Sequence, residues 1–218
     1  MRFSVLSIFP GMIEDFVSHG LLAKAIEKKI ITVKTYDLRD FAHNKHRKVD
    51  DRPFGGGAGM VMMPDPLFNA VEVIKEKKPG KVILFSAYAE TLTQQRIKEL
   101  SREDHLILVC GRYEGVDQRF IDTVVDEEIS LGEYVIMGGE VAAGVILEGV
   151  SRMLDGVVGN PESVETDSFY RDEQFGFPQY TQPRDYKGMQ VPEVLLSGHH
   201  KDISEWRRKN QKQKRSKQ

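Results

Sequence analysis

Short apolar and polar blocks alternate along most of the chain. Brief apolar runs predict buried strands at residues 2–8, 31–36, 81–85 and 106–110, with shorter strand-like pieces at 129–131 and 134–137. Apolar residues at helical spacing predict helices between them, at residues 13–29, 66–78, 117–124 and 140–154, and one that begins at Thr91. This alternation favours an α/β fold with a mostly parallel sheet and helices on both faces.

The pattern changes after Gly159-Asn-Pro161. The following stretch is polar, aromatic and punctuated by proline, and it has no clean periodicity. Such a segment is expected to order only on assembly or ligand binding. We therefore predict an α/β domain at residues 1–158, a linker at 159–171 and a small helical unit at 172–218.

Charge is nearly balanced overall, with a formal net charge of −2. Lys and Arg nevertheless cluster in two places. Seven of them and no acid lie between Arg207 and Lys217, and a second group comprises Arg39, Lys45, Arg47, Lys48 and Arg52. Two local basic patches indicate contact with a polyanion, whereas a solvated tail is the plain alternative for the first.

Cysteine usage and hydropathy bear on the cellular setting. Cys110 is the single cysteine, so a disulfide within the chain is excluded. No run of about 18 apolar residues occurs, so no membrane span is expected. We infer a reducing, cytoplasmic setting.

Two glycine-bounded loops follow apolar runs in the second half of the α/β region. One is Gly111-Arg-Tyr-Glu-Gly115, and the other is Gly138-Gly-Glu140. Glycine allows close backbone approach to a ligand, and loops at the ends of neighbouring strands form a crevice in open α/β sheets. The loops contain no Lys and few hydroxyls, which is unlike a phosphate site. They predict a cradle for a nucleoside-like cofactor.

Other motifs in the chain are less informative. Gly55, Gly57 and Gly59 match the G-x-G-x-G of Rossmann-type methyltransferases, but no apolar strand precedes them and no helix start follows. A flexible loop near a substrate fits better, and an ordinary turn is the alternative. His199-His200 lacks a third ligand close in sequence, so a metal site is not predicted there.

Five segments together resemble the bacterial tRNA (guanine(37)-N(1))-methyltransferases of the SPOUT superfamily, over nearly the whole chain and in order. They are Asp50-Asp-Arg-Pro-Phe-Gly-Gly-Gly-Ala-Gly-Met60, Gly111-Arg-Tyr-Glu-Gly-Val-Asp117, Leu131-Gly-Glu-Tyr-Val-Ile-Met-Gly-Gly-Glu140, Asp167-Ser-Phe169 and Ser197-Gly-His-His200. The resemblance implies a deep trefoil knot in the C-terminal part of the α/β domain, formed by the two glycine loops and the loop after Phe85. It also implies that residues 172–218 form a tRNA-binding domain.

The cofactor implied by the resemblance is S-adenosylmethionine in a bent conformation, held largely by backbone groups. A magnesium requirement is also implied, although the sequence displays no obvious metal cage. By motif, the expected cofactor-binding residues are Gly111, Tyr113, Glu114, Leu131, Gly132, Glu133, Tyr134, Val135, Ile136, Gly138 and Gly139.

The same resemblance assigns the catalytic roles and the partners. Asp167 matches the general base that removes the N1 proton of guanine, and Arg152 matches the cation that stabilises charge on O6. An ordinary aspartate has a pKa of about 3.9, so Asp167 is too weak a base to act unaided. A homodimer is implied in which the linker with Asp167 comes from the partner chain, and the substrate is tRNA.

Two segments depart from the family pattern. Ser86-Ala-Tyr-Ala89 stands where Ser-Pro-Gln-Gly is usual, and Tyr180-Thr-Gln-Pro183 stands where Tyr-Thr-Arg-Pro is usual. The first change puts cofactor contacts from that loop in question. We predict methylation of guanine N1 at tRNA position 37. The alternatives are a knotted ribose 2′-O-methyltransferase and a non-catalytic RNA-binding protein of the same fold.

Overall fold

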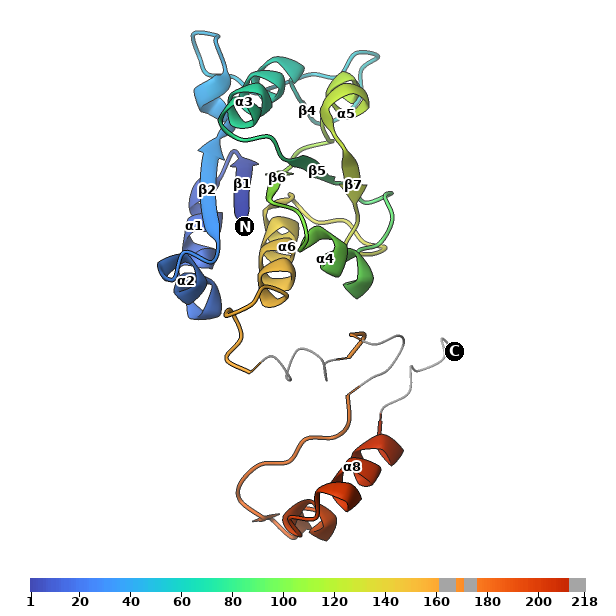
Figure 1. Cartoon of the computed structure of the whole chain (residues 1–218). Helices are drawn as coiled ribbons and strands as arrows, with labels where there is room; N and C mark the ends of the chain where they lie inside the picture. The colour runs from blue at the N-terminus through green and yellow to red at the C-terminus, as the bar shows by residue number, and fades with distance from the viewer. Residues whose placement is uncertain (161–167, 171–175, 212–218) are drawn as a thin grey trace. The chain divides into compact units, whose positions relative to one another are not determined.

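A computed structural model describes residues 1–160, 168–170 and 176–211 (Figure 1). The chain divides into two compact units, Met1–Gly159 and Asn160–Gln218. The linker and tail limits predicted from sequence remain predictions, because much of residues 159–171 and the end of the chain lie outside the described residues.

The first unit is built on a five-stranded sheet in the order β2-β1-β6-β5-β7, and every pairing in it is parallel. In register, Phe3 lies opposite Leu106, and Ile83 lies opposite Leu108. The predicted α/β fold with a mostly parallel sheet is therefore confirmed. The strands are β1 (Arg2–Ser7), β2 (Thr32–Asp37), β5 (Lys81–Phe85), β6 (His105–Val109) and β7 (Glu127–Ile129).

Helices cover both faces of this sheet (Figure 1). One face carries α1 (Pro10–Val17), α2 (Gly20–Glu27), α4 (Gln94–Leu100) and α6 (Glu140–Arg152). The other carries η1 (Leu38–Phe41), α3 (Pro64–Lys77) and α5 (Gln118–Val124).

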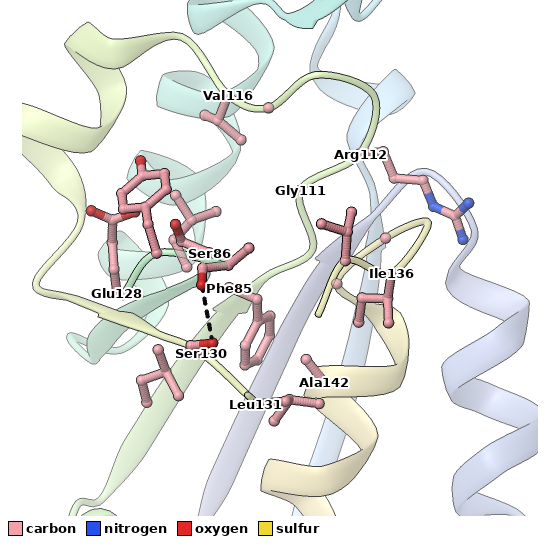
Figure 2. Close-up of a pocket in the computed structure, with 18 of the residues that line it drawn as sticks. Phe85, Ser86, Gly111, Arg112, Val116, Glu128, Ser130, Leu131, Ile136 and Ala142 are labelled. Carbon is pink, nitrogen blue, oxygen red and sulfur yellow. Dashed lines mark hydrogen bonds between the residues drawn. The ribbon is translucent and has the colours of Figure 1, made fainter. Parts of the chain in front are cut away.

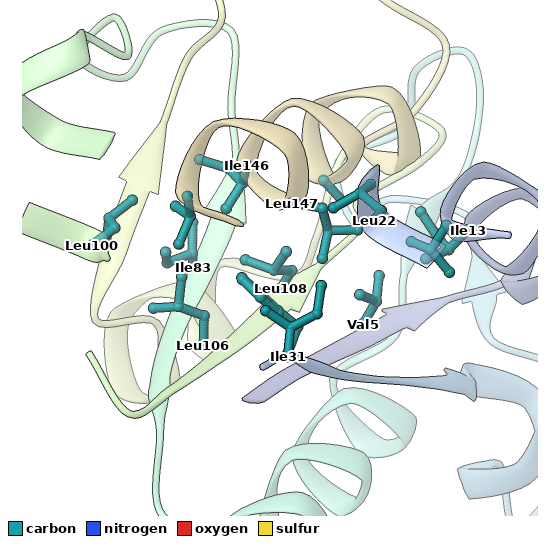
Figure 3. Packing of buried hydrophobic residues seen from close by; sticks show 14 of the residues in the cluster. Val5, Ile13, Leu22, Ile31, Ile83, Leu100, Leu106, Leu108, Ile146 and Leu147 are labelled. Carbon is teal, nitrogen blue, oxygen red and sulfur yellow. The ribbon is translucent and has the colours of Figure 1, made fainter. Parts of the chain in front are cut away.

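Strand alternation divides the buried side chains of β6 between two hydrophobic clusters. Leu106 and Leu108 belong to the first cluster, and Ile107 and Val109 belong to the second. In the first, Ile146 and Leu147 reach from α6 toward the sheet (Figure 3). All these side chains are fully buried, so the sheet is anchored on both faces.

Four sequence-based element predictions were wrong in detail. The predicted helix at 13–29 is two helices, because Gly20, the first residue of α2, takes a left-handed φ of +65°. The helix predicted to begin at Thr91 is α4, which begins at Gln94 and is capped by Thr93. The Arg96 amide donates to Thr93 Oγ1 at 3.1 Å. Residues 134–137 form a loop rather than a strand, and the strand predicted at 129–131 is β7 at Glu127–Ile129.

A short antiparallel pair brackets the glycine run. It joins β3 (Asp50–Asp51) to β4 (Val61–Met62). The trefoil knot implied by the resemblance stays a prediction. Within the described part of the chain, no helix is long and apolar enough to cross a membrane.

The second unit contains a small hairpin, a 3₁₀ turn and a helix. These are β8 (Asp185–Tyr186), β9 (Met189–Gln190), η2 (Glu193–Leu196) and α8 (His200–Lys209). Tyr180 packs edge-on against Trp206 with ring centroids 6.2 Å apart. The small helical unit expected at residues 172–218 stays a prediction in its limits and its role, and His199-His200 lies at the entry of α8.

Candidate active site

A cavity of about 410 Å³ opens at the carboxyl edge of β5, β6 and β7 (Figure 2). Parallel strands end at the same edge of a sheet, so the loops that follow them converge there. Four loop segments and the start of α6 supply the walls. Their residues are 84–88, 111–116, 128–131, 134–139 and Ala142, together with Gln118 and Ile121 of α5.

The two glycine loops lie side by side at this cavity. The Gly139 amide donates to the Gly111 carbonyl at 2.9 Å, and Arg112 forms an antiparallel bridge with Gly138. A Cβ on Gly139 would lie only 2.8 Å from Cys110 Cα. This contact is too short, and it cannot be relieved by a side-chain rotation because Cys110 Cα is a backbone atom. Glycine at 139 is therefore required by the approach of the two chain segments.

An ion pair between Arg112 and Glu140 joins these loops. Arg112 Nε donates to Glu140 Oε2 at 3.0 Å, and Ser7 Oγ donates to Glu140 Oε1 at 2.6 Å. The Glu140 side chain is 1% exposed and that of Arg112 is 18% exposed. The Arg112 guanidinium also stacks 4.5 Å from the Phe9 ring centroid. Sequence reasoning missed this cluster, although Arg112 and Glu140 lie inside the two glycine motifs.

The segment after the glycine run packs along the first glycine loop. The Glu114 amide donates to the Met60 carbonyl at 2.9 Å, and the Met62 amide donates to the Gly115 carbonyl at 2.9 Å. Gly59 and Met60 help to line a second, adjoining cavity of about 610 Å³, which shares Tyr113 and Glu114 with the first. The end of the glycine run thus lies next to the candidate site, as expected of a loop near a substrate.

Most residues predicted to hold a cofactor lie on the first cavity, while two do not. Gly132 and Glu133 belong to the same loop but are not among its lining residues. The predicted residues that line it are Gly111, Tyr113, Glu114, Leu131, Tyr134, Val135, Ile136, Gly138 and Gly139.

The unusual loop after β5 also reaches the cavity. Ser86, Ala87 and Tyr88 all contribute to its lining. The Ser86 amide donates to the Ile129 carbonyl at 3.1 Å, and Ser130 Oγ donates to the Ala87 carbonyl at 3.4 Å. This loop therefore lines the cavity although it lacks the usual proline and glycine.

Of the two predicted catalytic residues, only Arg152 lies in the described part of the chain, and it does not line the cavity. Arg152 is the last residue of α6, whereas Gly139 and Ala142 line the cavity at the opposite end of that helix. At about 1.5 Å per residue, the two ends are roughly 20 Å apart. Asp167 lies outside the described residues.

Part of the basic group at residues 39–52 is paired locally. Arg47 pairs with Asp40, and Lys48 Nζ lies 3.0 Å from Asp51 Oδ1. The Arg52 amide and Lys48 hold the pKa of Asp51 below its usual value. Much of the C-terminal basic group lies outside the described residues. Among those described, no cluster of three His, Cys, Asp or Glu residues could hold a metal ion.

A tRNA (Guanine-1)-methyltransferase TrmD family model matches residues 1–218. A tRNA (guanine-N(1)-)-methyltransferase of Dictyoglomus turgidum is 48% identical over 212 residues, covering 96% of this chain and 84% of the relative. The corresponding protein of Desulforamulus reducens is 46% identical, with 96% and 83% covered. The crystal structure of the tRNA (m1G37) methyltransferase from Aquifex aeolicus superposes with a TM-score of 0.80 at 40% identity, covering 94% of this chain and 87% of that one.

Proposed function

The chain belongs to the tRNA (guanine-N1)-methyltransferase family, and we propose that it methylates N1 of guanine 37 in the anticodon loop of tRNA. The observation that carries this proposal is the cavity at the strand ends, because the two glycine motifs of the family resemblance form its walls. Such an enzyme uses a methyl donor of the S-adenosylmethionine type.

The cavity fits a nucleoside-like methyl donor. Its volume of about 410 Å³ lies in the range of small-molecule sites. Apolar side chains such as Leu131, Ile136 and Ala142 suit a purine ring, and backbone N–H and C=O groups of the loops suit its polar edges. The sulfonium of the bound donor supplies an activated methyl group, so no covalent enzyme intermediate is needed.

We assign the activation of guanine N1 to Asp167 and Arg152. N1 of guanine is a poor nucleophile until its proton leaves, and we assign the removal of that proton to Asp167. Loss of the proton moves negative charge onto O6, which the guanidinium of Arg152 would stabilise. Alignment of the two reactants supplies much of the remaining acceleration.

A homodimer with shared active sites accounts for the position of Arg152. In one chain this residue stands at the far end of α6 from the cavity, so it would act at the cavity of the partner subunit. Exposed apolar side chains on α1 and α6 support such an interface. They border a groove of about 420 Å³ and include Met12, Phe16, Val141 and Val145.

Substrate contact is assigned to the two basic groups. Residues 39–52 and the C-terminal basic tail would bind the tRNA backbone, and the target base would be splayed into the site. We also propose a cytoplasmic setting and a role for magnesium. The described residues offer no cage for the ion, so no step is assigned to it.

One assay tests the proposed activity against the alternatives. The protein is incubated with labelled S-adenosylmethionine and unmodified tRNA that carries G at positions 36 and 37, and the tRNA is digested to nucleosides. Label in 1-methylguanosine is expected. Label in a 2′-O-methylated nucleoside would indicate the knotted ribose methyltransferase. Binding of tRNA without label would indicate a non-catalytic RNA-binding protein.

A further inference from the structure

Two buried polar atoms in the cavity wall have no hydrogen-bond partner among the described residues. They are Ser86 Oγ and Glu128 Oε1. Both residues line the candidate cofactor cavity. Figure 2 shows Ser86 and Glu128 on the β5 and β7 side of the cavity, across from Gly111 and Ile136.

Strand alternation explains why Glu128 is directed to this cavity. Its neighbour Glu127 faces the other side of the sheet, where it pairs with Arg96 and lies 3.0 Å from Lys81 Nζ. Successive side chains of a strand point to opposite faces, so Glu128 cannot share those two cations. Its carboxylate is left on the cavity side, where the described residues supply no hydrogen-bond partner for Oε1.

A buried carboxylate oxygen without a donor is costly, and such groups require an explanation. An ionised carboxylate only accepts hydrogen bonds, while the Ser86 hydroxyl can both donate and accept. The missing partner is therefore an O–H or N–H donor that enters the cavity. The methyl donor carries two kinds of strong donor beyond its purine ring, namely the ribose hydroxyls and the α-ammonium group.

We propose that Glu128, assisted by Ser86, is a further cofactor-binding residue that accepts a hydrogen bond from a ribose hydroxyl or the α-ammonium group of the methyl donor. This inference rests on the proposed function, since it takes the cavity to be the cofactor site. It adds a charged side chain to a site otherwise attributed to backbone groups of glycine loops. It also gives the Ser86–Ala89 loop a specific contact in place of the usual proline and glycine.

Glu128→Met tests the proposal because it removes the acceptor and keeps a similar shape. Affinity for S-adenosylhomocysteine, measured by calorimetry, is expected to fall roughly 10- to 100-fold, which is the effect of one hydrogen bond to a charged group. The melting temperature of the unliganded variant is expected not to fall, because an unpaired buried oxygen has been removed. Glu128→Gln, which keeps one acceptor oxygen, is expected to lose less affinity. Glu72→Met on the exposed face of α3 is the matched control and should bind like the wild type.

Ligand fragments identify the donor. If Glu128→Met weakens adenosine as much as S-adenosylhomocysteine, and wild-type protein binds 2′- or 3′-deoxyadenosine less well than adenosine, the donor is a ribose hydroxyl. If Glu128→Met leaves adenosine binding unchanged and weakens only S-adenosylhomocysteine, the donor is the α-ammonium group.

Two results would overturn the inference without touching the proposed function. One is wild-type affinity in Glu128→Met. The other is a lowered melting temperature in both Glu128 variants with equal loss of affinity, which would indicate a structural role. Failure of the wild-type protein to bind S-adenosylhomocysteine at all would overturn the proposed function and this inference together.

Discussion

Arg112 and Glu140 form a nearly buried ion pair that links the first glycine loop to the start of α6, with both Arg112 Nε and Nη2 3.0 Å from Glu140 Oε2. Ser7 at the end of β1 satisfies the other carboxylate oxygen. Glu140 also lies in the first turn of α6, where the helix dipole favours a negative charge. Three segments that are distant in sequence thus meet at one carboxylate beside the cavity.

We predict that Arg112→Met is more damaging than the loss of both charges. The single variant leaves Glu140 buried without its cation, so unfolding free energy should fall by about 3 kcal/mol. The double variant Arg112→Met/Glu140→Gln should recover part of this loss. Urea denaturation of the two single variants and the double variant completes the thermodynamic cycle. Additive effects of the two changes would show that the pair is not coupled.

Substitution of Asp167 should separate binding from chemistry. Asp167→Asn is expected to retain affinity for S-adenosylhomocysteine and to lose roughly 10²- to 10⁴-fold in turnover, which is the usual contribution of one proton acceptor. Single-turnover methylation of tRNA measures the rate, and calorimetry measures the affinity. A variant that methylates at nearly the wild-type rate would show that Asp167 is not the base.

Mixing two inactive variants tests whether active sites are shared. Ile136→Glu places a carboxylate in the cofactor cavity of its own chain, whereas Arg152→Ala removes the cation at the far end of α6. In a symmetric dimer, a mixed pair keeps one site with an intact cavity and an intact partner arginine. Co-refolded variants should therefore regain part of the activity that each lacks alone. A mixture that stays inactive, although mixed dimers form, would place both residues in one chain's site.

The parts of the fold and of the cavity that could be predicted from the sequence are those marked by neighbouring residues in the chain. Apolar runs located β1, β2, β5 and β6, because burial on both faces of the sheet makes a strand a continuous apolar run, whereas the polar start of β7 left its position two residues off. Glycine marked the two cavity loops, since close approach at Gly139 leaves no room for a side chain. The contact of Ser7 with Glu140 spans 133 residues, and no periodicity encodes such a pairing.

The role of Glu128 could not be predicted from the sequence, because it depends on how distant segments pair. Glu127 and Glu128 look alike in sequence, and only the pairing of β7 with β5 decides which carboxylate meets Arg96 and which meets the cavity. Roles for Arg152 and Asp167 came from the family resemblance alone. The hydrophobic pattern of a chain records which side chains are buried, and it carries no signal for the chemical role of a polar residue such as these.

His105 should make stability depend on pH near neutrality. Its Nε2 lies 2.9 Å from Ser4 Oγ, and its Nδ1 lies 3.0 Å from the Lys78 carbonyl. Burial lowers the pKa of His105 below its usual value, despite the carbonyl contacts that favour the charged ring. The folded state therefore binds fewer protons at this site than the unfolded state between the lowered pKa and about 6.5.

Stability should consequently decline as pH falls below about 6.5, until the lowered folded-state pKa is passed. Urea unfolding midpoints between pH 5 and 8 measure this slope. The matched variant His105→Gln keeps hydrogen-bonding groups at the same place and does not titrate, so its slope over that interval should be smaller by the contribution of one proton. Equal slopes in the two proteins would mean that His105 titrates alike when folded and unfolded, and that its burial between β1 and the end of α3 leaves its proton affinity unchanged.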